Sequence, residues 1–152
     1  MNWFYKIAYP VFTFLLSFFR PITIGVRLLL VKEGQVLLVR HVYQNGWFLV
    51  GGGANRHETL EQTARREAHE EAGAELGKLR LFGIFSHFPE GRTDHITVFA
   101  CEDFTVSGQS DAEIEELRFF PLDQLPPDIR PGNARRVEEY RQNPNQVTFG
   151  NW

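Results

Sequence analysis

Cysteine is nearly absent from this sequence of 152 residues, in which Cys101 is the single thiol. One cysteine excludes an internal disulfide framework and is typical of a reducing compartment, so we expect a cytoplasmic protein. Cys101 falls in an apolar, strand-like run, where a buried thiol packs as a small hydrophobic side chain. We therefore do not expect it to act as a nucleophile.

Strong charge of either sign is also lacking, because the formal net charge is only −3. Without a basic excess, there is no electrostatic reason to expect nucleic acid as the main partner. The sequence is 43% hydrophobic and contains 14 phenylalanines, which argues against a disordered chain. The length suits one folded domain with its own core.

Long hydrophobic runs are missing as well. The apolar stretch between Pro10 and Arg20 is shorter than the roughly 20 residues that a transmembrane helix needs, and Lys6 and Pro10 interrupt any longer one. No small-residue cleavage site of a signal peptide precedes Arg20. We predict an N-terminal apolar helical segment over residues 1–20. Three roles are open for this segment: packing on the domain, a homodimer contact and peripheral membrane contact. We favour the first two.

Apolar strand patterns alternate with turn residues from residue 21 onward. Runs rich in aliphatic and β-branched residues predict strands, and the Lys32–Gln35 turn predicts a hairpin between the first two. The predicted strands cover residues 22–31, 36–42, 78–88 and 95–104, and a final helix covers residues 132–142 with Asn133 as its N-cap. Residues 143–152 are expected to form a polar C-terminal tail.

The stretch from Gly51 to Ala74 combines a glycine loop with a well-delimited helix. Thr59 and Gln62 have the spacing of a capping box, and Gly73 is a suitable residue just after a helix end, so the helix is predicted over residues 60–72. The three glycines before it allow a ligand to approach the backbone closely, whereas a tight turn alone would also explain them.

Three glutamates crowd one side of this predicted helix. Glu67, Glu70 and Glu71 fall within an arc of about 100°. Because like charges at this spacing repel, a hard divalent cation such as Mg²⁺ or Mn²⁺ would stabilise the cluster through oxygen ligands. The alternative is a solvated acidic face balanced by Arg65 and Arg66.

The same stretch resembles the Nudix box. The family pattern is Gly-x5-Glu-x7-Arg-Glu-U-x-Glu-Glu-x-Gly-U, where U is a bulky or aliphatic residue, and the sequence matches it without a gap from Gly52 to Ala74. Val50 departs from the proline of many relatives, and Arg56-His57 stands where Pro-Gly or a similar pair is usual. A looser resemblance follows at Asp111–Phe120 and the Pro-Leu-Asp-x-Leu-Pro turn after it.

The resemblance implies a fold and a domain organisation. It implies an α/β protein, a Nudix-type α/β/α sandwich around a mixed β-sheet, to which the N-terminal helix would be an addition. The expected division is an apolar segment over residues 1–20, a Nudix hydrolase domain over residues 21–142 and a tail over residues 143–152.

The resemblance also implies a metal-dependent hydrolase of a nucleoside diphosphate linked to another moiety. With Mg²⁺ or Mn²⁺ as the cofactor, Glu67, Glu70 and Glu71 are the expected ligands, with the main-chain carbonyl of Gly52 or Gly53 as a further one. Glu67 and Glu70 are alternative candidates for the general base. Arg66 would orient Glu67 through a charge-assisted hydrogen bond.

Residues outside the box supply further candidates. Glu113 is our candidate for an additional base or ligand, although an exposed acidic turn would also explain it. Arg27 and Arg40 are candidates for phosphate binding, or simply surface residues of strands. Trp47 would stack on a base or fill the core, and we favour the core. Gly52 and Gly53 would bring the backbone close to the phosphates.

The substrate is left open by the sequence. ADP-ribose, a nucleotide sugar and a nucleoside triphosphate are all compatible with the box. Pro89 is a weak indication of ADP-ribose, because it lies near the position of a proline in relatives that cleave it. Two other functions compete with hydrolysis: a non-catalytic module that senses a nucleotide, and an interaction protein at the membrane periphery.

Overall fold

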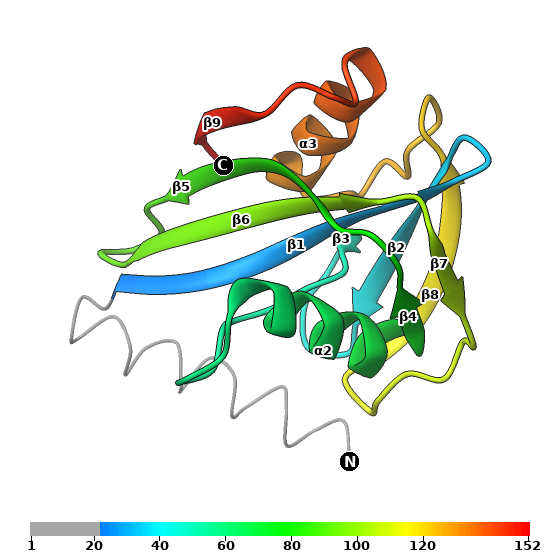
Figure 1. The fold of residues 1–152 in the computed structure, drawn as a ribbon, viewed down its shortest axis with the longest axis horizontal. Helices are drawn as coiled ribbons and strands as arrows, with labels where there is room; N and C mark the ends of the chain where they lie inside the picture. Colours follow the sequence, from blue (N-terminus) through cyan, green and yellow to red (C-terminus); the bar gives the residue numbers. More distant parts are fainter. Residues whose placement is uncertain (1–21) are drawn as a thin grey trace.

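Two long neighbouring strands, β1 (Ile22–Lys32) and β6 (Thr93–Cys101), run through the centre of the main sheet. The structure is a computed structural model that describes residues 22–152, and in it these strands pair in parallel from Ile22 beside Thr93 to Leu30 beside Cys101. Within this range the sheet has seven strands in the order β3-β2-β1-β6-β5-β9, and β8 pairs with β2. Their bounds are β2 (Gln35–His41), β3 (Phe48–Leu49), β5 (Arg80–His87), β8 (Ile114–Pro121) and β9 (Thr148–Asn151) (Figure 1).

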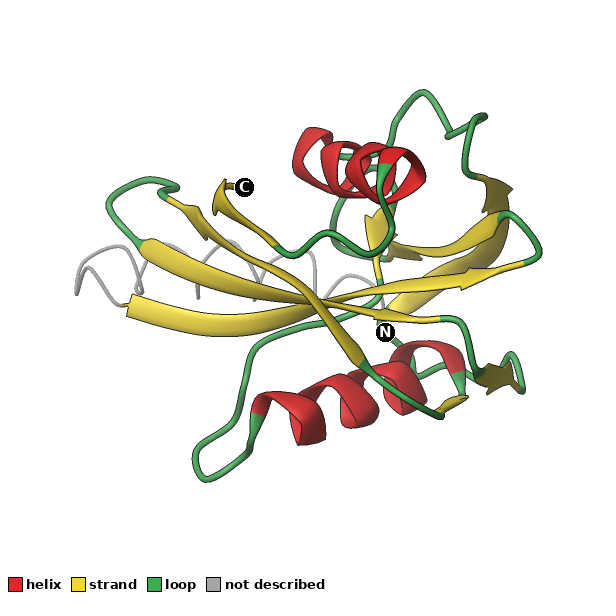
Figure 2. Cartoon of the chain, turned by 45° about the horizontal axis from the view of Figure 1, so that its top comes forward, coloured by secondary structure: helices red, strands yellow, loops and turns green. Residues whose placement is uncertain are grey.

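One helix covers each face of this sheet. Helix α2 (Leu60–Ala72) lies on one side and α3 (Pro131–Gln142) on the other, as Figure 2 shows. The sheet is mixed, because β1–β6 and β5–β9 are parallel pairs and the other pairs are antiparallel. The predicted α/β/α sandwich is therefore confirmed. A small second sheet joins β4 (Ala74–Leu76) to β7 (Phe104–Val106).

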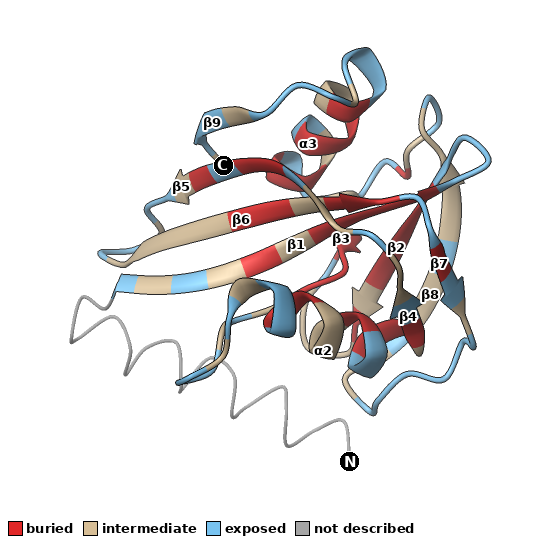
Figure 3. Ribbon diagram, in the orientation of Figure 1, coloured by how far each residue is buried: buried red, intermediate tan, exposed pale blue. Residues whose placement is uncertain are grey.

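The core has two halves because side chains of β1 alternate between the faces of the sheet. Val26, Leu28 and Leu30 pack in the cluster beneath α2, and Leu29 and Val31 pack in the cluster beneath α3. Figure 3 shows the buried residues along the central strands and on both helices. From α2 the core receives Ala64, Ala68 and Ala72, and from α3 it receives Val137 and Tyr140. The small alanine stripe of α2 lets that helix lie close to the strands.

Both ends of α2 are where the sequence predicts them. The Thr59 side chain accepts a hydrogen bond from the Gln62 backbone N–H, and the Gln62 side chain accepts one from the Thr59 N–H, which completes the capping box. Gly73 follows the last residue in the left-handed conformation, with φ of 57°. Just before the helix, His57 also has a positive φ, of 65°, at a position where the resemblance leads one to expect glycine.

Three predicted elements differ in detail. Helix α3 begins at Pro131 after the N-cap Arg130, so the prediction of Asn133 as N-cap was wrong. The predicted strand 95–104 is divided into β6 and β7 by a bend. Residues 143–152, expected as a polar tail, contain β9, which pairs in parallel with β5.

The predicted helix over residues 1–20 lies outside the described residues. Packing on the domain and a homodimer contact, the two roles favoured for this segment, and the alternative of a membrane contact therefore stay predictions. Between residues 22 and 152, no helix is long and apolar enough to cross a membrane.

Candidate functional site

The glycine loop lies directly alongside β1. The Val26 N–H donates to the Gly52 carbonyl over 2.9 Å, and the Ala54 N–H donates to the Ile24 carbonyl over 2.9 Å. These bonds hold the loop against the strand while α2 passes on its other side. A methyl group on Gly52 would lie 2.5 Å from Glu67 Oε1, whereas one on Gly53 would meet nothing within 4 Å. The close approach of backbone and carboxylate therefore requires glycine at residue 52.

Arg66 connects the loop to the acidic side of α2. Its Nη1 donates to Glu67 Oε1 over 2.7 Å and to Glu70 Oε2 over 2.9 Å. Its Nε donates to Glu58 Oε1 over 2.8 Å, and its Nη2 donates to the Gly53 carbonyl over 3.0 Å. One guanidinium group therefore contacts three carboxylates and the loop backbone, while the role of Arg66 in orienting Glu67 stays a prediction.

Glu58 braces the loop from the other end of the same network. Besides Arg66, its carboxylate accepts hydrogen bonds from the Asn55 N–H and the Thr63 hydroxyl, both over 2.9 Å. These bonds, that of Arg66 above all, lower the pKa of Glu58 to about 2. Glu58 is thus ionised at neutral pH. Through Arg66 it links the residues just before α2 to the middle of the helix.

Glu71 is the buried member of the glutamate cluster. Its Oε2 accepts a hydrogen bond from the Gly51 N–H over 2.8 Å, and its Oε1 lies 3.6 Å from His41 Nε2. Burial raises the pKa of Glu71 to about 8. Burial, with the neighbouring charge of Arg27, lowers the pKa of His41 to about 4. In this structure both groups are therefore mainly neutral at pH 7.

Glu67 and Glu113 are less buried but shifted in the same direction. Burial raises the pKa of Glu67 and outweighs the attraction of the Arg66 guanidinium. Burial also raises the pKa of Glu113, to which the negative charge of Asp111 adds. Carboxyl groups with raised pKa values are suited to take up a proton from water near neutral pH.

These groups surround a cavity of about 250 Å³. Three glutamates face it, from the middle of α2, its end and the turn before β8: Glu67, Glu71 and Glu113. The rest of its wall consists of the glycine loop and polar residues from β1, β2 and the following turn, namely Arg27, His41, Tyr43, Gln44 and Gly51–Gly53. Glu70 does not line this cavity, and its carboxylate is half exposed beside Arg66.

The chemistry of the cavity fits a divalent cation. In the part of the chain described, no three carboxylate, histidine or cysteine side chains already form a metal-binding group. Arg66 donates hydrogen bonds to both Glu67 and Glu70. Glu71, however, is a buried carboxyl that remains protonated without a cation beside it. Carboxylate oxygens on one small cavity are the donor set that Mg²⁺ and Mn²⁺ take. The Gly52 carbonyl already accepts the Val26 N–H, so a metal would use its second lone pair.

Two residues predicted for substrate binding are placed elsewhere. Trp47 is buried, with only 2% of its surface exposed, and packs edge-on against Phe120 in the core, which was the favoured of its two predicted positions. Arg40 stacks on Trp47 and forms an ion pair with Asp128 over 2.9 Å. Neither side chain lines the cavity described above or the larger one next to it.

Sequence reasoning missed three residues of the cavity wall: His41, Tyr43 and Gln44. For His41 there was a signal, since it is a titratable residue in the apolar run VLLVRHV. The structure buries it and leaves its Nδ1 without a hydrogen-bond partner among the described residues. Tyr43 and Gln44 lie in a turn whose direction no local pattern reveals.

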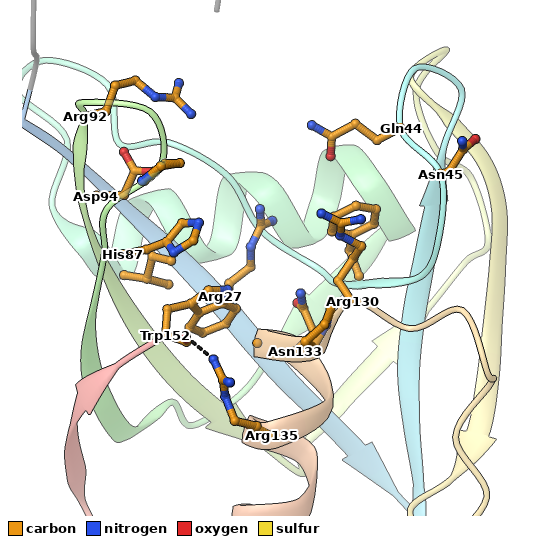
Figure 4. A pocket seen from close by; sticks show the side chains of 15 residues that line it. Arg27, Gln44, Asn45, His87, Arg92, Asp94, Arg130, Asn133, Arg135 and Trp152 are labelled. Atoms are coloured by element: carbon orange, nitrogen blue, oxygen red, sulfur yellow. Dashed lines mark hydrogen bonds between the residues drawn. The ribbon is translucent and has the colours of Figure 1, made fainter. Parts of the chain in front are cut away.

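A larger cavity of about 680 Å³ adjoins the first, and Arg27 and Gln44 line both (Figure 4). Its wall is formed by the turn between β5 and β6, the start of α3 and Trp152. Pro89, which the sequence analysis treats as a weak indication of ADP-ribose, lies in this wall together with His87. His95 does not, and its Nδ1 instead lies 3.0 Å from the Ser86 hydroxyl.

Comparisons with known proteins agree with this arrangement. The NUDIX domain matches residues 20–140. The chain is 39% identical over 57 residues to the RNA pyrophosphohydrolase of Haemophilus influenzae, which covers 38% of this chain and 29% of the relative. It is 30% identical over 101 residues to the Bacillus subtilis protein named "Putative ADP-ribose pyrophosphatase YjhB", covering 63% of this chain and 49% of the relative. The fold matches a MutT NUDIX hydrolase from Burkholderia pseudomallei with a TM-score of 0.71 and 24% identity, covering 78% of this chain and 97% of that chain.

Since the NUDIX domain match covers most of the sequence, the chain belongs to the Nudix family. The resemblance of the Gly52–Ala74 stretch is thereby confirmed. The chain spans less than half the length of both curated relatives.

Proposed function

We propose that this protein hydrolyses the pyrophosphate bond of a nucleotide derivative with the help of Mg²⁺ or Mn²⁺. The observation that carries this proposal is the placement of Glu67, Glu71 and Glu113 around one cavity beside the glycine loop. The names of two relatives, an RNA pyrophosphohydrolase and an ADP-ribose pyrophosphatase, support the same reaction class. Because one relative is named for RNA, RNA is included among the candidate substrates, although the net charge gave no reason to expect it.

In this proposal, the divalent ion would be held by Glu67 and Glu71, with Glu70 and the Gly52 carbonyl as the further predicted ligands. When bound, such an ion neutralises phosphate charge and lowers the pKa of bound water. Arg66 keeps the Glu67 carboxylate in place by a 2.7 Å hydrogen bond to Oε1. Glu70 can reach the cavity only if it leaves Arg66, and its role is therefore the least supported.

The reaction needs one proton acceptor. Water attacks phosphorus, the bridging P–O bond breaks, and the bridging oxygen leaves with the second phosphate-containing product while a base takes the proton of water. Glu67 is our candidate for the base, because it lines the cavity. In addition, Arg66 donates a hydrogen bond to only one of the two Glu67 carboxylate oxygens, Oε1, within the described part of the chain. Glu113, on the same cavity wall, is the alternative. Arg27 lies where it can contact a phosphate group at the boundary of both cavities.

The test is hydrolysis of ADP-ribose, nucleotide sugars, nucleoside triphosphates and 5′-triphosphorylated RNA, each with Mg²⁺ and with Mn²⁺. Glu67→Gln and Glu71→Gln should lower turnover by roughly 10²–10⁴-fold while the protein stays folded. The exposed Glu115, which does not line the cavity, provides the matched control Glu115→Gln, and this variant should keep full turnover. Turnover that persists in EDTA, or an equal loss in Glu115→Gln, would contradict the proposal.

A further inference from the structure

The larger cavity is strongly basic, although the protein as a whole carries a net charge of −3. Four guanidinium groups and one carboxylate line it: Arg27, Arg92, Arg130, Arg135 and Asp94. They come from β1, the β5–β6 turn, the residue before α3, the first turns of α3 and the start of β6. Figure 4 shows these side chains around a common space. An excess of guanidinium groups from distant segments favours an anionic ligand.

Two of these arginines have no partner within the described chain. Neither a hydrogen bond nor an ion pair engages the side chains of Arg92 and Arg130 there, whereas Arg135 donates to the Trp152 carbonyl and Arg27 to the Gly51 carbonyl. The Asp94 carboxylate accepts a hydrogen bond from the Thr23 hydroxyl rather than from an arginine. The planar fork of a free guanidinium matches two oxygens of a phosphate group.

The start of α3 and an aromatic ring add to this lining. Pro131, Gly132 and Asn133 lie in the cavity wall, and the N-cap Arg130 makes no side-chain hydrogen bond to the first turn. The free N–H groups of a helix start favour negative charge, in the same direction as the arginines. Trp152 lies in the wall as well and provides an aromatic surface of the kind on which a nucleobase stacks.

We propose that this larger cavity binds a second phosphate group of the substrate, separate from the pyrophosphate that is cleaved. The inference rests on the proposed function, since it places the cleaved pyrophosphate in the adjoining smaller cavity. Arg27 and Gln44 line both cavities, so one ligand can extend from one into the other. A volume of about 680 Å³ accommodates a nucleotide-sized group.

The substrate class follows from this charge. The sugar of ADP-ribose or of a nucleotide sugar is neutral and leaves Arg92 and Arg130 without a counter-charge. A nucleotide with a 2′- or 3′-phosphate, or with a phosphodiester to a next nucleotide, supplies it. Both sources present the same group, a phosphate on the ribose, and both should be preferred over substrates that lack it.

Binding without hydrolysis tests the inference. We would measure the affinities of AMP and adenosine 3′,5′-bisphosphate by calorimetry in EDTA, where the carboxylate cluster has no metal. The bisphosphate should bind about tenfold more tightly, which corresponds to one additional charge-assisted contact. The Arg92→Gln, Arg130→Gln double variant should bind both ligands with equal affinity. Arg141→Gln removes an exposed arginine outside the cavity and should keep the tenfold preference.

A 5′-phosphorylated dinucleotide, pApA, distinguishes the two sources of the phosphate. Tighter binding of the bisphosphate alone indicates a monoester ligand, and tighter binding of pApA indicates a phosphodiester. Equal affinity of AMP, the bisphosphate and pApA for the unaltered protein would overturn the inference, as would an equal loss of preference in Arg141→Gln. Because this assay involves no hydrolysis, a failure of the proposed function would show separately, as the absence of turnover on every substrate.

Discussion

At the scale of single residues, the candidate site depends on how closely the backbone approaches the carboxylates. Gly52 and Gly53 are neighbours in one loop and both line the smaller cavity, but they differ in the space around them. At Gly52 a side chain would collide with Glu67, while at Gly53 it would meet nothing. Substituting each glycine in turn therefore distinguishes a steric requirement for glycine at the site from the general flexibility of a glycine loop.

We predict that Gly52→Ala lowers turnover at least tenfold, because the added methyl group displaces the Glu67 carboxylate from its place beside Arg66. Gly53→Ala should lower turnover clearly less than Gly52→Ala, since neither glycine has a positive φ and no protein atom lies within 4 Å of the new methyl group. Steady-state rates for both variants, with circular dichroism to confirm folding, provide the measurement. Equal rates for the two variants would refute the steric explanation.

At the scale of elements, α2 is the unit that carries the chemistry, and local interactions determine its start. The capping box of Thr59 and Gln62 satisfies N–H groups that the helix itself leaves free. The first turn also contacts Glu58 through Thr63, so the cap and the loop brace belong to one structure. A substitution that weakens the start of the helix should therefore lower the free energy of unfolding more than it changes the geometry of the site.

Replacing Thr59 by alanine should lower the free energy of unfolding by about 1 kcal/mol, the usual effect of losing an N-cap side chain. Ser110→Ala, which removes an exposed hydroxyl with no hydrogen bond among the described residues, should leave the free energy of unfolding unchanged. Chemical denaturation of both variants at one pH measures the difference. A loss of similar size in Ser110→Ala would show that the cap is not its cause.

The comparison of α2 with α3 shows which parts of the fold can be predicted from the sequence. Thr59, Gln62 and Gly73 define α2 through contacts within a few residues, and its bounds were predicted correctly. Asn133 looked like a helix cap but instead accepts the Leu49 N–H, a partner 84 positions away along the chain. The neighbouring sequence does not reveal such a contact, because the same amide side chain can cap a helix or accept a hydrogen bond from a distant buried strand.

The same reasoning applies to the candidate site. The box residues could be recognised from spacing, and Arg27 and Glu113, two candidates from outside the box, line the same cavity as Glu67 and Glu71. His41 could not be assigned, because its proximity to Glu71 arises from the pairing of β2 within the sheet and from the packing of α2 on it. For Trp47 and Arg40, the alternation along a strand does not reveal that the two side chains stack on each other.

At the scale of the whole molecule, the buried cluster sets how stability responds to pH. Glu71 keeps its proton in the folded protein up to a pKa of about 8, while in the unfolded chain it loses it near 4.5. Between these values the unfolded state binds fewer protons, so folding becomes weaker as the pH rises. His41 acts in the opposite sense, but only between its folded pKa of about 4 and its unfolded value of 6.5.

In EDTA, we predict that the free energy of unfolding falls between pH 6.5 and 8, where Glu71 dominates the change. Glu71→Gln should remove most of this dependence and Glu115→Gln should not. Adding Mn²⁺ at pH 8 should stabilise the unaltered protein and leave Glu71→Gln unaffected, because the ion binds the folded state through the ionised carboxyl group. Thermal unfolding at several pH values measures both effects. A pH slope shared by all three proteins would contradict the assignment to Glu71.

Strand β9 has a consequence beyond the site. It pairs in parallel with β5 over four residues, Gly83 to Ser86, and so occupies the backbone groups of a long strand that would otherwise border the sheet. An open strand edge is a template for pairing with another molecule, and a short edge strand is a poor one. β9 has only four residues, including Gly150 with a φ of 156°. It therefore protects the protein against edge-to-edge aggregation, and chains that lose these last residues should self-associate at concentrations at which the intact chain stays dispersed.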